Sequence, residues 1–287
     1  MGEIVAAALV SHDPTIMLDE EVRRAGNGGH DTSLVAGFAE IRNELSALGA
    51  DTLIIFDTHW FTTAEHIVAG SDHYRGTYTS DELPTIISDY EYDYAGAPQL
   101  AEAIERAAKT NRQRARNVTN ENISRHYPTI NLVHYLRLDE KILSVSVCQT
   151  AACHNYLGFG QVIAEAIGQT TGRFALLASG GMSHSFWPLD DFSRHLGKDP
   201  DNVISEDARE FDERILELWR VGDHATVIDR YPEYLRFQPE GFFGHYLMTI
   251  GALGGRDCTA KGRLMSNYEN AAGTGQAHVW FDLGSEM

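Results

Sequence analysis

Five short apolar runs are spaced along the chain, and more polar segments separate them. They cover residues 4–10, 52–56, 142–147, 174–178 and 278–283. Apolar runs of roughly four to eight residues are typical of strands that are buried in a sheet. The pattern therefore predicts five strands.

Segments with helical spacing lie between these runs. Leu34, Phe38, Ile41, Leu45 and Leu48 recur every three or four residues, which places one apolar face toward a sheet. Further helices are predicted over residues 98–109, 156–168, 205–221 and 243–253. Pro98 suits the opening turn of the first of these, and Ser205 suits the cap of the third.

The alternation of strands and helices indicates the fold class. It predicts an α/β protein with a mixed central β-sheet flanked by helices. No internal repeat, low-complexity tract or linker divides the chain, so residues 1–287 are expected to form a single domain. Residues 70–96 are rich in loop-forming residues, and we interpret them as an insertion within this domain.

Composition and charge narrow the class of protein. Hydrophobic residues make up 43% and charged residues 22% of the chain, which is ordinary for a globular protein. No stretch approaches the roughly 18 consecutive apolar residues of a membrane span, so no membrane partner is expected. A net charge of -18 repels phosphate backbones, so no nucleic-acid partner is expected either. The three cysteines show neither CxxC spacing nor a disulfide pattern, which predicts a cytoplasmic location.

Three histidines stand where predicted strands end. His12 follows the first strand in "ALVSHDPT", His59 follows the second in "IIFDTHWF", and His184 follows another strand and a glycine pair in "LLASGGMSHSF". Ligands of open α/β sheets bind beyond the carboxyl ends of the strands, so these imidazoles are expected to converge. Histidines in polar surroundings are expected to face solvent instead, and these are His66, His73, His154, His195 and His224.

Converging histidines suggest a metal site. Two neutral imidazoles and one carboxylate form the facial arrangement that binds Fe(II) and leaves positions open for substrate and oxygen. Spacing alone does not select the carboxylate. Zn(II) in a hydrolase, or no metal at all, remains an alternative on the basis of ligand chemistry.

Several segments resemble the motifs of one enzyme family. "SHDPT", "FDTHW", "SGGMSHSF", "PEGFFGH" and "AGTGQ" are similar to motifs of the class III extradiol ring-cleavage dioxygenases, which include the protocatechuate 4,5-dioxygenase β subunit. The similarity extends from residue 4 to about residue 281. The stretch "FDTHWFTTAEHIVAGSDHYRGTYTSDELP" most resembles members that cleave 3,4-dihydroxyphenylacetate (homoprotocatechuate) at the 2,3 bond.

The resemblance implies an activity and a ligand set. It implies a non-haem Fe(II) enzyme, active as a homo-oligomer, that uses O2 to convert a catechol to a muconic semialdehyde. His12, His59 and Glu240 match the iron ligands, and Glu240 rests on the resemblance alone. His184 matches the acid/base histidine of the family.

The chain departs from the family pattern at one position. Many members have Asp-His-Gly where this chain has "RHYPTINL", so Tyr127 and Pro128 replace the His and the Gly. A phenol can donate a hydrogen bond to a ring oxygen as an imidazole can, so Tyr127 is a catalytic candidate. Pro128 leaves open whether His126 or Tyr127 points inward. Arg125, together with His126, is a candidate contact for the acetate side chain of the substrate.

Asp13 and Asp57 are expected either to orient the ligand imidazoles or to cap local turns.

The sequence is also compatible with other functions. A protocatechuate or 2-aminophenol dioxygenase would need the same iron site and differ only in the pocket wall. A non-enzymatic binding protein resembling Memo would share the fold, but it would have no need of the complete set of ligands.

Overall fold

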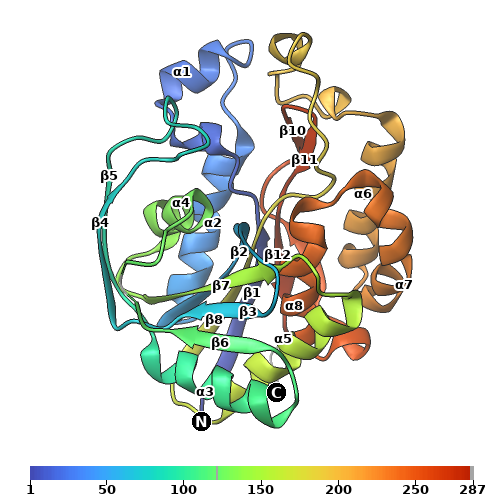
Figure 1. Cartoon of the computed structure of the whole chain (residues 1–287). Helices are drawn as coiled ribbons and strands as arrows, with labels where there is room; N and C mark the ends of the chain where they lie inside the picture. The colour runs from blue at the N-terminus through green and yellow to red at the C-terminus, as the bar shows by residue number, and fades with distance from the viewer. Residues whose placement is uncertain (121, 285–287) are drawn as a thin grey trace.

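The central β-sheet lies between two layers of helices in the computed structural model, which describes residues 1–120 and 122–284 (Figure 1). Among the described residues, eight strands form this sheet in the order β6-β3-β7-β2-β8-β1-β12-β9. Their bounds are β1 (Glu3–Val10), β2 (Thr52–Thr62), β3 (His66–Ala69), β6 (Ala115–Val118), β7 (Lys141–Cys148), β8 (Arg173–Ser179), β9 (Lys261–Leu264) and β12 (His278–Asp282).

The sheet is mixed, as the alternation of elements predicted. The four central strands β7, β2, β8 and β1 run parallel, whereas β12 is antiparallel to β1 and β3 is antiparallel to β7. All five predicted strands are confirmed, and they occupy the middle of the sheet and one flank. The short strands β3, β6 and β9 were not predicted, and β6 and β9 form the two edges.

Helices cover both faces of the sheet, and the side chains of β1 alternate between them (Figure 1). Ala8 and Val10 pack toward the layer that contains α2 (Ser33–Ala47) and α4 (Tyr127–Leu136). Leu9 packs toward the other layer. That layer contains α3 (Pro98–Thr110), α5 (Cys153–Gly168), α6 (Glu206–Arg220), α7 (His224–Tyr234) and α8 (Gly244–Ala252). Strands that are apolar on both faces suit this sandwich, because full burial of a side chain such as Leu177 stabilises the fold by about 1.5–3 kcal/mol.

The predicted helix starts have a clear structural basis. The Oγ of Ser205 accepts a hydrogen bond from the backbone N–H of Ala208 at 3.2 Å and so caps α6. Pro98 occupies the opening turn of α3, where its missing N–H costs nothing. The helices α1 (Glu20–Ala25), α4 and α7 were not predicted. No described helix is long and apolar enough to span a bilayer.

Residues 70–96, interpreted from the sequence as a loop-rich insertion, contain a β-hairpin. Strands β4 (His73–Tyr78) and β5 (Tyr90–Ala95) pair antiparallel as a separate sheet at the side of the molecule (Figure 1). Tyr74 and Tyr94 anchor the hairpin in the core beside α2 and α4. A second hairpin, formed by β10 (Glu269–Ala271) and β11 (Thr274–Gln276), follows β9 in the chain.

The prediction that five histidines face solvent is wrong for two of them. His66 is buried and stacks on Phe159 with ring centroids 4.3 Å apart. His224 is buried between the hydroxyl of Tyr246 and the carbonyl of Ala260, at 2.8 and 2.7 Å. Glu65 and Asp223, which precede them in the sequence, are partly exposed, so local composition gives no sign of this burial. His73 and His154 are exposed, and His195 is half-buried.

Candidate active site

The register of three central strands brings His12 and His59 together. Val10 of β1 and Asp57 of β2 are both paired with Ser179, the last residue of β8, which lies between those strands. His12 and His59 each lie two residues beyond this row, at the carboxyl edge of the sheet. Their ring centroids are 5.2 Å apart. The Oγ of Ser179 lies 2.9 Å from Nδ1 of His12 and fixes the orientation of that ring.

His59 lies in a bulge of β2 and not beyond the end of the strand. The strand was predicted to end at Phe56, but it continues to Thr62 with a shift of register between Asp57 and Phe61. One carboxylate oxygen of Asp57 accepts the backbone N–H groups of His59 and Trp60 at 3.0 and 3.2 Å. The bulge directs His59 away from the pairing ladder.

Glu240 is held by a left-handed turn before α8. Gly241, Phe242 and Phe243 have φ values of 54°, 55° and 60°, a conformation that costs energy for residues other than glycine. Burial of the Phe243 ring against Tyr246, at 4.6 Å between centroids, helps to hold this turn. A Cβ on Gly241 would approach the side chain of Thr58 to 2.6 Å, so the turn packs directly on the bulge.

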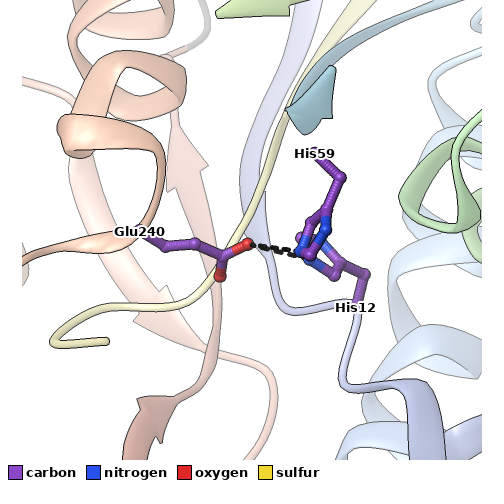
Figure 2. A group of neighbouring side chains, drawn as sticks. All are labelled: His12, His59 and Glu240. Carbon is purple, nitrogen blue, oxygen red and sulfur yellow. Dashed lines mark ion pairs between the residues drawn. The ribbon is translucent and has the colours of Figure 1, made fainter. Parts of the chain in front are cut away.

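Figure 2 shows the carboxylate of Glu240 pointing at the two imidazoles. Oε1 of Glu240 lies 2.9 Å from Nε2 of His12 and 3.6 Å from Nε2 of His59. All three ligand atoms fall within 4.8 Å of one another. Donors bound to one ion at about 2.0–2.2 Å lie roughly 3 Å apart when they meet at a right angle, so the spacing suits a shared metal ion.

The electrostatics of this cluster favour a cation. Burial opposes charge on Glu240, but His12 and His184 lower the pKa of its carboxyl well below the usual range. Burial also opposes charge on His59, but hydrogen bonds to Glu240 and Glu82 raise its pKa to about 10. A buried carboxylate needs a positive partner, which here is either a protonated imidazole or a metal ion that replaces the proton and binds the imidazole lone pair. These residues therefore fit a divalent metal.

His184 and Tyr127 border the same cluster. Nδ1 of His184 lies 3.5 Å from Oε2 of Glu240 and has no hydrogen-bond partner among the described residues. Burial lowers the pKa of His184, so its imidazole is neutral near pH 7. The hydroxyl of Tyr127 lies 2.8 Å from Nε2 of His59. Pro128 occupies the first turn of α4, and this start of the helix points Tyr127 inward.

The remaining candidates lie farther from the cluster. Arg125 places its guanidinium 4.2 Å from the centre of the Tyr74 ring and donates to the carbonyl of Ile123. His126 stacks on Trp60 with centroids 6.3 Å apart. Neither Arg125 nor His126 is among the described residues that line the cavity beside His12, Tyr127 and Glu240.

Asp13 and Asp57 cap local structure and do not contact the ring of a ligand histidine. Asp13 accepts the backbone N–H of Thr15 at 3.0 Å. Asp57 accepts the N–H and the hydroxyl of Thr129 at 3.2 and 2.6 Å, in addition to the two N–H groups of the bulge. Asp57 therefore ties the bulge that carries His59 to the helix that carries Tyr127.

A cavity of about 220 Å³ opens onto His12, Tyr127, His184 and Glu240. It is smaller than the roughly 300–1,000 Å³ of pockets for drug-sized ligands, so it suits a small molecule. Two loops complete its wall with side chains that are mostly apolar: Glu82, Leu83 and Ile86 from the hairpin, and Phe186, Leu196 and Lys198 after β8. A larger hollow of about 640 Å³ lies at the opposite end of β1, beside Glu3, away from the histidines.

Sequence reasoning missed several residues that support the cluster. Thr58 donates its hydroxyl to Oε1 of Glu240 at 2.5 Å. The buried carboxylate of Asp212 accepts hydrogen bonds from the hydroxyls of Ser183, Tyr234 and Tyr268, each at 2.6 Å. Through Ser183, Asp212 fixes the loop that carries His184. The position of Thr58 next to His59 in the sequence indicates that Thr58 lies near the cluster. Nothing in the sequence pairs Asp212 with Ser183.

Comparison with known proteins identifies the family. A family model described as the catalytic LigB subunit of aromatic ring-opening dioxygenase matches residues 6–282. The chain belongs to this family. It is therefore an extradiol ring-opening dioxygenase, an enzyme class that uses O2 and a small aromatic substrate and that implies a metal cofactor.

Two relatives extend this finding. A 3,4-dihydroxyphenylacetate 2,3-dioxygenase of Escherichia coli is 32% identical over 258 residues, which cover 88% of this chain and 91% of the relative. The crystal structure of an uncharacterized protein from Escherichia coli K12 matches with a TM-score of 0.56 at 13% identity and covers 96% of this chain and 99% of that one. The second similarity concerns the fold alone.

Proposed function

We propose that the single domain of this chain catalyses the Fe(II)-dependent cleavage of 3,4-dihydroxyphenylacetate at the 2,3 bond to a muconic semialdehyde. The main support is the convergence of His12, His59 and Glu240 beside a cavity for a small ligand. The name of the 32% identical relative supports the choice of substrate.

We assign the metal as Fe(II), held by His12, His59 and Glu240. Two imidazoles and one carboxylate are the facial ligand set of non-haem iron oxygenases, and this set leaves positions open. When bound, iron supplies sites for the catechol oxygens and O2 and a path for electrons from the ring to oxygen. Zn(II) accepts the same ligands but has no redox chemistry, so it does not explain a dioxygenase.

We assign His184 as the acid/base residue. Its Nδ1 is unpaired among the described residues and faces the cluster, so it can accept the proton that a catechol hydroxyl loses on binding. The same imidazole can later return the proton to an oxygen atom. Geometry supports this role because His184 lines the cavity together with His12 and Glu240.

We assign Tyr127 as a hydrogen-bond donor to a substrate oxygen. Its hydroxyl now faces Nε2 of His59, the nitrogen that a metal would use. If this nitrogen bound a metal, it could no longer accept a hydrogen bond from the phenol. The hydroxyl of Tyr127 could then donate to a ligand in the cavity that Tyr127 lines. The oxygen atoms of a catechol bound beside the cluster are acceptors within the same cavity.

A panel of substrates tests the proposed reaction. The protein is loaded with Fe(II) without oxygen, then mixed with O2 and one of four substrates: 3,4-dihydroxyphenylacetate, protocatechuate, 4-methylcatechol or 2-aminophenol. We expect a yellow product to form fastest from 3,4-dihydroxyphenylacetate. Faster cleavage of protocatechuate or 2-aminophenol would overturn the assigned substrate and support the assigned ring-cleavage reaction. Absence of product with every substrate would overturn the proposal and favour a binding role.

A cytoplasmic location and a homo-oligomeric state stay predictions. Cell fractionation and light scattering of the purified chain test them.

A further inference from the structure

Lys198 is the one lysine or arginine among the described residues that line the cavity. Its side chain is 14% exposed, and its ammonium forms an ion pair with the carboxylate of Asp13. The same nitrogen lies 3.1 Å from the hydroxyl oxygen of Thr15. A positive charge therefore stands in the cavity wall, which also contains the carboxylates of Asp13, Glu82 and Glu240 and several apolar side chains.

Contacts from distant parts of the chain fix the backbone of Lys198. Its N–H donates to Oδ1 of Asn27 at 2.9 Å, and its carbonyl accepts the N–H of Asn270 at 3.2 Å. The side-chain amide of Asn270 also donates to the carbonyls of His195 and Gly197, at 2.9 and 2.8 Å. This segment is held in place on both sides, so Lys198 is a pre-positioned group.

The ammonium of Lys198 retains capacity for a ligand. It has three N–H donors, and among the described residues Asp13 and Thr15 accept two of them. The ion pair with Asp13 and the contact with Thr15 orient the ammonium of Lys198, and one donor remains for a ligand.

The cavity pairs this cation with surfaces for an aromatic ring. Leu83, Ile86 and Phe186 supply apolar contacts, and His12 and Glu240 lie in the same wall as Lys198. A ring bound near the ligand cluster thus has a cation within the same small space. Arg125, the cation that the sequence favoured for this task, lies over the ring of Tyr74 and not in the cavity wall.

We propose that Lys198 binds a carboxylate on the side chain of the catechol and thereby determines the substrate class. The inference rests on the proposed function and deepens it: the preferred substrates are catechols with an anionic side chain, and neutral catechols are poor substrates. Asp13 and Thr15 position the ammonium for this contact.

Substrate discrimination tests this role. The variants K198M, K198Q and K198R are compared with wild type by kcat/KM for 3,4-dihydroxyphenylacetate and for the neutral 4-methylcatechol. We expect the ratio of the two values to fall by roughly 10–100-fold in K198M and K198Q through KM, because a hydrogen bond to a charged group is lost. K198R should retain most of the ratio. K141M removes the same charge at an exposed position of β7 and should keep the wild-type ratio.

Binding without metal separates this inference from the proposed function. The metal-free protein is titrated with 4-hydroxyphenylacetate and with 4-methylphenol, and binding is followed by NMR. K198M should bind 4-hydroxyphenylacetate more weakly than wild type does, and it should bind 4-methylphenol equally well. An unchanged preference for the acid in K198M and K198Q would overturn the role of Lys198, even if the wild-type enzyme cleaves catechols. Failure of wild type to cleave any catechol would overturn the function, while the titration would still decide whether Lys198 selects anions.

Discussion

Nε2 of His12 lies 2.9 Å from Oε1 of Glu240, although the two residues are far apart in the sequence. The contact joins the end of β1 to the left-handed turn before α8. With Nε2 of His59 at 3.6 Å from the same oxygen, the three side chains form a compact set of candidate metal ligands.

Loss of a ligand and loss of the acid/base residue should have different effects on the metal. H59A should lose bound iron, because one of three ligands is removed. H184A should keep iron and lose roughly 100–10,000-fold in kcat, the usual contribution of a general acid or base. Metal analysis and steady-state rates check this. H73A alters an exposed histidine of the hairpin and should match wild type in both. Release of iron by H184A would show that His184 is a metal ligand and not the acid/base residue.

The hydroxyl of Tyr127 should matter for turnover and not for the metal. Y127F removes the donor and keeps the ring, so we expect unchanged iron content and a kcat lower by about 10–100-fold. Y92F, in the separate hairpin, serves as the control. Wild-type turnover in Y127F would show that the hydroxyl makes no contact in the reaction.

The left-handed turn at Gly241 should tolerate no side chain. G241A adds a Cβ at φ 54° and 2.6 Å from Thr58, so both backbone strain and a clash act on the turn that holds Glu240. G28A has a similar φ of 60° with open space around the Cβ and reports the backbone cost alone. Urea unfolding should show a larger loss of stability in G241A, and iron titration should show weaker binding there. Equal behaviour of the two variants would mean that contact with Thr58 is unimportant.

His278 should make the fold sensitive to acid. Its Nδ1 accepts the N–H of Ser11 at 3.1 Å and its Nε2 lies 3.0 Å from the carbonyl of Leu34, so only the neutral ring fits. Burial lowers its pKa to about 3, below the 6.5 of an unfolded chain. The unfolded state therefore binds the proton more tightly, and this residue should remove about 2 kcal/mol of stability between pH 7.5 and pH 5.

Urea unfolding of metal-free protein at pH 7.5 and pH 5 measures this contribution. H278Q should lose less stability between the two pH values than wild type does, whatever its stability at pH 7.5. H73Q should show the wild-type difference. An identical pH dependence in H278Q and wild type would contradict the assignment.

The central sheet could be predicted because its strands are apolar on both faces. The run 52–56 marks a buried strand without help from tertiary contacts. The edge strands β6 and β9 are short and partly exposed, so their composition does not distinguish them from loops. The continuation of β2 through a bulge was missed because Asp57, which supports the bulge, looks like a residue that ends a strand.

The site was predictable only in part, for a similar reason. His12 and His59 could be found because strand ends in a parallel sheet share one edge. Glu240 lies in a turn without periodic pattern, so the resemblance alone identified it. Lys198 escaped notice because its position depends on Asn27 and Asn270, which no local pattern links.

Oxygen uptake by the Fe(II)-loaded protein tests the central claim most directly. On addition of 3,4-dihydroxyphenylacetate, wild type should consume one O2 per substrate, because both oxygen atoms enter the product. The H59A variant and the metal-free protein should consume none. Uptake that is equal in wild type and H59A, or no uptake by wild type with any catechol, would contradict the assignment of His12, His59 and Glu240 as the catalytic iron site.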